Sequence, residues 1–231
     1  MEIPTQVPVM TLPSATLFPQ ALLPLYIFEA RYRKMLADAL QGDRMFSVAM
    51  QDPAKVREKP CHIAGLGLIR VSVDHSDGTS HLILQGLTRV QLVQTVQTKP
   101  YRVEEIRPLA AEAVDNVIID ALVAKVLELV KHRLKVGPPP FPFPALGPAE
   151  PQGKKSKSKA SAVAVEDVLQ YLERIAHPDH LADMVSCAVL ASPIARQTIL
   201  ATLGVEERLK HLIHFLMAEI AHYQKEKGSK G

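Results

Sequence analysis

The hydrophobic period of this chain changes near residue 113, and that change constrains its fold more than any other feature. Before it, short apolar runs such as Leu66–Val73 alternate with polar residues and lie between turn signals, which predicts strands. After it, apolar residues recur at helical spacing from Val114 to Leu134. The sequence therefore predicts an α+β protein. A β-rich lobe over residues 1–110, a partly closed antiparallel sheet or barrel with one helix, precedes an α-helical bundle lobe over residues 111–229.

A tight turn at Asp77-Gly78 is the clearest local signal in the first half. It predicts a hairpin that joins Leu66–Val73 to Ser80–Leu84. Gly86 interrupts the apolar pattern that follows, so the next strand is expected to start beyond it. The other runs with strand-like composition are Val7–Leu12, Phe46–Met50, Arg89–Thr98 and Tyr101–Ile106.

One helix is predicted among the strands, over Phe28–Leu40. Apolar side chains at Phe28, Tyr32, Met35 and Leu36 share one face of it. We interpret the charged and aromatic cluster Phe28-Glu29-Ala30-Arg31-Tyr32-Arg33 as the start of a packing helix with a charged outer face. Glu29 would then complement the helix dipole in the first turn. The alternative is that this cluster forms a functional site.

The second half predicts helices separated by proline and glycine. Ser192-Pro193 is a good helix start, with serine as the N-cap. A segment rich in proline and lysine, at about 137–163, has the composition of a flexible insertion; docking of that insertion on a proline-recognition module is an alternative. The helices are expected at Val165–Ile175, Pro178–Leu190, Pro193–Leu203 and Val205–Tyr223.

Motifs for catalysis, cofactors or metals are missing from the sequence. There is no phosphate-binding GxxxxGK[ST], no GxSxG and no HExxH. Gly65 and Gly67 form a lone GxG, and His211 and His214 are too few for a zinc site. Cys187 lies among apolar residues and is expected to be a buried, inert thiol. We therefore expect no enzyme activity, no cofactor and no metal.

Charge and hydropathy exclude further classes of function. The formal net charge of +3 is too small to indicate nucleic-acid binding, and the lysine-rich runs are expected to be solvated. No uncharged run approaches the length of a membrane span, and a basic n-region typical of a signal peptide is absent. These features predict a cytoplasmic protein with neither nucleic-acid nor membrane partners.

Several motifs together resemble the N-terminal substrate-binding domain of Lon proteases. They are LFPQALLPLYIFEARYRKMLADAL, HIAGLGLIRV, DGTSHLILQGLTRVQLVQ, KPYRVEEIRPL and LADMVSCAVLASPIARQTILATLGVEERLKHLIHFL. The resemblance covers nearly the whole chain except the Pro/Lys-rich insertion. It implies a β-rich lobe with one helix, then a helical lobe, and a role in recognising proteins or unfolded segments. The sequence shows no ATPase or peptidase module, so it is similar to stand-alone members of the family.

The leading hypothesis is thus a non-catalytic module that binds unfolded protein or peptide segments, an adaptor or regulator in protein quality control with a protease or another protein as partner. The alternatives are a small-molecule-binding protein or cryptic enzyme that uses the groove between the lobes, and a scaffold that docks a protein on its insertion. The candidate partner-binding residues are Phe18, Leu23, Leu25, Phe28, Arg31, Tyr32 and Arg33.

Overall fold

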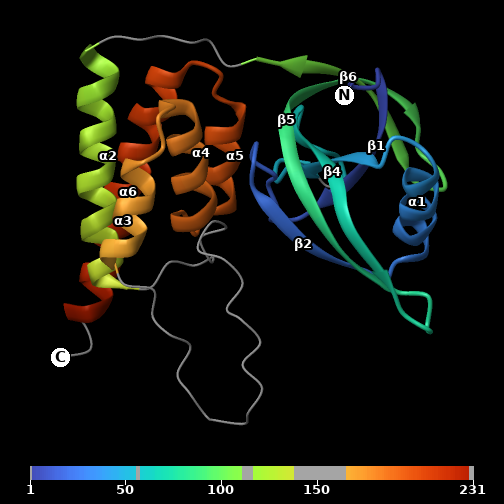
Figure 1. Ribbon diagram of the computed structural model, residues 1–231, viewed down its shortest axis with the longest axis horizontal. Coiled ribbons are helices and arrows are strands. Elements are labelled where there is room, and N and C mark those ends of the chain that lie inside the picture. Colours follow the sequence, from blue (N-terminus) through green and yellow to red (C-terminus); the bar gives the residue numbers. More distant parts are fainter. Residues whose placement is uncertain (1, 56–57, 111–116, 138–164, 229–231) are drawn as a thin grey trace.

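A computed structural model describes residues 2–55, 58–110, 117–137 and 165–228. It has a β-lobe and a helical lobe side by side (Figure 1). Residues 138–164, which include nearly all of the predicted insertion, lie outside the described residues. Residues 111–116, beside the predicted boundary between the lobes at residues 110 and 111, also lie outside them. Within the described part, no helix is long and apolar enough to cross a membrane.

The β-lobe is a six-stranded sheet with one helix. Its strand order is β2-β5-β4-β3-β1-β6, and an additional pairing of β5 with β6 brings the sheet close to a closed ring. The elements are β1 (Gln6–Leu12), β2 (Leu22–Ile27), α1 (Ala30–Gln41), β3 (Met45–Met50), β4 (Ile63–Asp74), β5 (Ser80–Gln97) and β6 (Arg102–Leu109).

The ring closure confirms the predicted partly closed sheet, but the sheet is mixed rather than antiparallel throughout. β1 pairs with β3 in parallel, with Val9 opposite Ser47 and Leu12 opposite Met50. Parallel neighbours need a long connection, and here the chain passes through β2 and α1 between the two strands.

The predicted hairpin is confirmed, and its second strand runs further than expected. Val73 pairs with His81, and Gly78 adopts a left-handed φ of 79° in the turn. β5 continues through Gly86 instead of ending there. Gly86 is needed for a different reason, because a Cβ atom there would lie 1.9 Å from the backbone oxygen of Phe18. The chain at Phe18 therefore crosses directly over the sheet.

Gly65 has the same role, which explains the GxG pattern noted in the sequence. A Cβ atom at Gly65 would lie 2.0 Å from the backbone oxygen of Leu17. Phe18 is fully buried and belongs to the hydrophobic core of the helical lobe. The Leu17–Phe18 segment thus lies between the sheet and the helices.

The helix α1 begins at Ala30, two residues later than predicted. Tyr32, Met35 and Leu36 are buried as expected. The prediction that Phe28 packs with them is wrong, because Phe28 precedes the helix and is 59% exposed. Glu29 is the N-cap residue rather than a first-turn residue, and its side chain makes no capping hydrogen bond.

The helical lobe packs its helices around one apolar core. Figure 1 places α4 and α5 on the side that faces the β-lobe, and α1 on the far side of the β-lobe. The predicted N-cap is confirmed, since the Ser192 hydroxyl accepts the Ala195 N–H. The helices are α2 (Val117–Val136), α3 (Val165–Glu173), α4 (Pro178–Val189), α5 (Pro193–Ala201) and α6 (Val205–Gly228).

Buried charges join the two lobes. Arg89 on β5 forms a two-pronged ion pair with Asp183 on α4, and Arg89 Nε also donates to the backbone oxygen of Leu200 at 3.0 Å. Arg208 on α6 approaches the same carboxylate, with Nη1 3.4 Å from Oδ1. All three charged residues are almost completely buried, so they form part of the interface and not a surface site.

Candidate functional site

A cluster of exposed apolar side chains covers the outer side of β2, β5 and β4. Adjacent strands bring these side chains together, because Pro24 pairs with Ile83 and Val71 pairs with Ile83 from the other side. Residues directly opposite in a sheet point to the same face. We call this surface the apolar face; its members, each between 38% and 59% exposed, are Leu22, Tyr26, Phe28, Val71, Val73 and Ile83.

The apolar face contains a depression of about 380 Å³. Aromatic rings lie along its side: Tyr26 stacks on Phe28 with centroids 5.7 Å apart, and its ring is tilted against that of His81, with centroids 4.7 Å apart. His75 continues the row, with its Nε2 2.6 Å from Nδ1 of His81. The lining residues are Pro24, Leu25, Tyr26, Val71, Val73, His81, Leu82 and Ile83. Such a depression suits an apolar side chain.

The edge of the sheet beside this face is poorly suited to pairing with another strand. β2 is the first strand in the sheet order. The Gly86 N–H bonds to the oxygen of Ala21, so by alternation Leu22, Pro24 and Tyr26 direct their backbone groups away from β5. Proline has no N–H, and it therefore removes the middle donor of this edge. Side chains on the face, rather than backbone pairing, are available to a partner.

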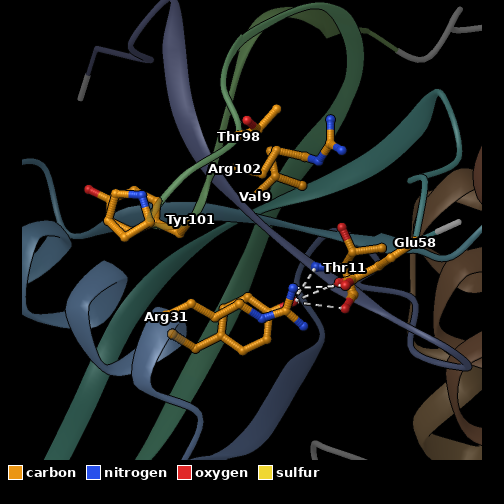
Figure 2. A pocket seen from close by; sticks show the side chains of 9 residues that line it. Val9, Thr11, Arg31, Glu58, Thr98, Tyr101 and Arg102 are labelled. Atoms are coloured by element: carbon orange, nitrogen blue, oxygen red, sulfur yellow. Dashed lines mark hydrogen bonds and ion pairs between the residues drawn. The ribbon is translucent and has the colours of Figure 1, made fainter.

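A second, polar pocket of about 170 Å³ lies at the start of α1. Figure 2 shows Arg31, Glu58 and Thr11 gathered on one side of it, with Tyr101 and Arg102 on other walls. Burial raises the pKa of Tyr32 to about 12. The hydrogen bond that Arg31 donates to Glu58 is the largest cause that raises the pKa of Arg31 above its usual value. Both side chains thus keep their protons and act as donors.

A third cavity, of about 460 Å³, lies in the groove between the lobes. The β-lobe contributes Met50, Cys61 and Ile63, and α5 contributes Ile194 and Gln197. Burial is the main cause that raises the pKa of the Cys61 thiol, which disfavours the reactive thiolate. Within the described residues, no three His, Cys, Asp or Glu side chains come together as a metal site would require.

Comparison with known protein families identifies the family of this chain. The model for the ATP-dependent protease La (LON) substrate-binding domain matches residues 6–218. The chain belongs to this family. It is 24% identical over 222 residues to a Lon protease of Dictyoglomus thermophilum, covering 95% of this chain and 25% of the relative. It is 25% identical to Lon protease 2 of Myxococcus xanthus over 93% of this chain and 24% of the relative.

Solved structures share the fold of this LON-type chain. The N-terminal domain of a Mycobacterium avium complex Lon protease superposes with a TM-score of 0.67 at 18% identity, covering 92% of this chain and 98% of that one. A Lon N-terminal domain protein from Xanthomonas campestris gives a TM-score of 0.62 at 16% identity, covering 91% and 98%. The chain spans about a quarter of the length of the curated Lon proteases it matches.

The structure separates the seven candidate residues instead of bringing them into one site. Phe18 is buried between the lobes and presents no surface to a partner. Phe28 lies on the apolar face, and Leu25 lines the depression there. Leu23 is half-buried against the core of the β-lobe. Arg31 and Tyr32 line the polar pocket, while Arg33 lies beside Gly78 of the hairpin.

Sequence reasoning missed most of the apolar face. Val71, Val73, His81 and Ile83 were assigned to strands without regard to the side on which they point. A signal for this face was present in the predicted hairpin. Alternate residues of a strand point to opposite faces, and the residues opposite the core-facing ones include β-branched side chains rather than polar ones. Tyr26 lies in Leu22–Ile27, which forms β2, and no strand is predicted there from the sequence.

The exposure of Phe28 reverses its expected contribution to stability. Phe28→Ala is expected to lower the free energy of unfolding by less than about 1 kcal/mol, because little surface is removed from a packed environment. Tyr32→Ala is expected to cost about 3–5 kcal/mol, the usual range for a buried aromatic side chain. Urea denaturation of both variants measures the difference. A Phe28→Ala protein as unstable as Tyr32→Ala would show that Phe28 is a core residue after all.

Proposed function

We propose that this chain is a non-catalytic recognition module that binds unfolded or extended peptide segments on its apolar face. In the cytoplasm it would act as an adaptor or regulator of proteolysis, and a protease is the expected protein partner. The observation behind the proposal is the cluster of half-exposed apolar and aromatic side chains on β2, β4 and β5. Contiguous exposed apolar surface is typical of interaction sites.

The geometry of the face favours an extended apolar segment over a small polar ligand. The depression is shallow and lined mostly by aliphatic and aromatic side chains. Tyr26 and Phe28 offer stacked rings at its edge, and tyrosine is common among residues that dominate binding energy. An extended peptide places alternate side chains on one side, which matches the spacing of residues on a sheet.

The proposal predicts that removing apolar side chains from the face weakens peptide binding. A fluorescein-labelled peptide of about ten residues, rich in Phe and Leu, is titrated with the protein and followed by fluorescence anisotropy. Tyr26→Ala is expected to weaken binding by about tenfold or more, as for a residue at the centre of an interface. Val73→Ser is expected to weaken it by about fivefold, since burial equivalent to about one methyl group is lost.

The control for that experiment is Val96→Ser. Val96 is 50% exposed and Val73 is 52% exposed, and both are strand valines, but Val96 lies in the distal part of β5 beyond the lining of the depression. Val96→Ser should bind the peptide like the unchanged protein. Equal losses at the two valines, or no loss at Tyr26, would contradict binding on the apolar face.

The groove between the lobes supports a second candidate, a small-molecule site. Gln197 there donates its Nε2 to the oxygen of Ile63 at 2.9 Å, and among the described residues its buried Oε1 has no hydrogen-bond partner. A ligand with an apolar body and one N–H donor would complete this pairing. Loss of binding in Ile194→Ser, with Tyr26→Ala unaffected, would favour the groove over the apolar face.

A further inference from the structure

Two hydrogen-bond donors in the polar pocket are held in place by neighbouring groups of the chain itself. The Arg31 guanidinium lies 4.4 Å from the centre of the Tyr32 ring, and its Nε donates to Glu29 at 2.9 Å. The Tyr32 hydroxyl donates to the backbone oxygen of Thr11 at 3.0 Å and accepts the Thr11 N–H at 3.3 Å. Donors fixed in this way lose little freedom when they bind an acceptor.

A carboxylate of the protein already occupies these donors. Glu58 accepts from Nη1 of Arg31 at 2.8 Å, and its Oε1 lies 3.3 Å from the Tyr32 hydroxyl, whose single proton it shares with the backbone oxygen of Thr11. Glu58 follows β3 in the chain, and Figure 2 shows it beside Thr11, next to the guanidinium of Arg31. The side chains of Arg31 and Glu58 are each 39% exposed. Ion pairs at this level of exposure are weak, so another carboxylate can replace Glu58 at small cost.

The charges of the lining select the class of ligand. Arg31 and Arg102 line the pocket and Glu58 is the one carboxylate among its lining residues. Arg102 uses one amino group, Nη1, to bind Glu104 at 2.7 Å. Without Glu58 the pocket presents two guanidinium groups and two tyrosines, Tyr32 and Tyr101. Guanidinium groups bind planar carboxylates with good geometry, and a volume of about 170 Å³ admits only a small group.

We infer that this pocket is a carboxylate-binding site and that Glu58 occupies it as an internal competitor. The ligand carboxylate has two possible sources, the C-terminus of a bound peptide or a small dicarboxylic acid. The peptide source rests on the proposed function, whereas the small acid does not. In either case the incoming carboxylate displaces Glu58 from Arg31 and Tyr32.

The test compares peptides that differ only at the C-terminus. One labelled peptide carries a free carboxylate and the other a C-terminal amide, and both are titrated with the unchanged protein and with Glu58→Gln. Glu58→Gln is expected to bind the free-carboxylate peptide about tenfold more tightly than the amide, as charge-assisted hydrogen bonds are stronger than neutral ones. The preference should be smaller in the unchanged protein and absent in Arg31→Gln. Succinate, titrated separately by NMR, tests the small-acid source.

Matched variants distinguish binding from a structural role. Lys34→Gln removes a cation from the exposed side of α1, where Lys34 pairs with Asp38, and should keep the preference. Glu128→Gln, exposed on α2, should leave the preference as small as in the unchanged protein. If Glu58 has only a structural role, the Glu58→Gln variant should unfold at a lower temperature than the unchanged protein and should bind a carboxylate no more tightly. That outcome would overturn the inference.

The remaining outcomes separate this inference from the proposed function. Equal binding of both peptides to Glu58→Gln, with loss of both in Tyr26→Ala, would refute the peptide-terminus source and leave the proposed function standing. Succinate-induced shifts that vanish in Arg31→Gln would support the site through the small acid even if no peptide binds. Absence of both the peptide preference and the succinate shifts would refute the carboxylate site.

Discussion

Replacing Gly86 with alanine is expected to lower the free energy of unfolding by about 3 kcal/mol or more, at or above the upper end of ordinary overpacking. The added Cβ would lie 1.9 Å from the backbone oxygen of Phe18. An obstructing side chain could rotate away from the new Cβ atom, but the atom that obstructs it here belongs to the backbone and cannot. The same backbone is held in place, because the Gln20 N–H bonds to the oxygen of Gly86 at 2.8 Å.

Urea denaturation followed by circular dichroism measures this loss. Gly204→Ala is a suitable control, since the nearest atom to a Cβ there is a side-chain oxygen of Glu207 at 3.8 Å. Its expected cost is at most about 1 kcal/mol, from a poorer residue at the start of α6. If Gly86→Ala were as stable as Gly204→Ala, the Phe18 segment could not lie directly on the sheet as described.

Asp183→Asn is expected to cost about 3–5 kcal/mol, because it leaves buried arginines without their counter-charge. The Asp183 carboxylate accepts a hydrogen bond from Nη1 of Arg89 at 2.9 Å, and its Oδ1 lies 3.4 Å from Nη1 of Arg208. Burial, the largest cause, lowers the pKa of Arg208, and the charge of Asp183 acts in the opposite direction. An asparagine oxygen can accept a hydrogen bond but cannot offset two positive charges.

The same denaturation assay measures the effect, with Asp43→Asn as the control. Asp43 is exposed in the turn after α1, so its variant should stay within about 0.5 kcal/mol of the unchanged protein. Because Arg89 and Asp183 belong to different lobes, the Asp183 variant should also increase proteolytic cleavage between them. An Asp183→Asn protein of normal stability would mean that the buried pair contributes nothing to the joining of the lobes.

The sequence by itself determined the elements whose signals are local. Asp77-Gly78 specified the hairpin because a tight turn requires a residue that tolerates positive φ, and Gly78 has φ 79°. Ser192 specified the start of α5 because its hydroxyl accepts an N–H three residues ahead. The helical period placed Tyr32, Met35 and Leu36 on the buried side of α1. In each case the residues that make the signal lie within about one or two turns of each other.

Only the tertiary structure decided which residues meet across the fold. Periodicity reports that a side is buried, but not what covers it, so the parallel pairing of β1 with β3 could not be predicted from either strand alone. Gly86 was taken for an interruption because its real constraint comes from Phe18, on a segment that precedes β2 in the chain.

The candidate sites depend on the same long-range packing. The carboxylate-binding pocket combines Thr11, Arg31, Glu58 and Arg102 from four separate parts of the chain, and no single motif contains more than one of these residues. The apolar face exists because register brings Val71 and Pro24 to opposite sides of Ile83. Register and strand order are set by the burial of the whole β-lobe core, and a one-residue shift would turn these side chains to the other face.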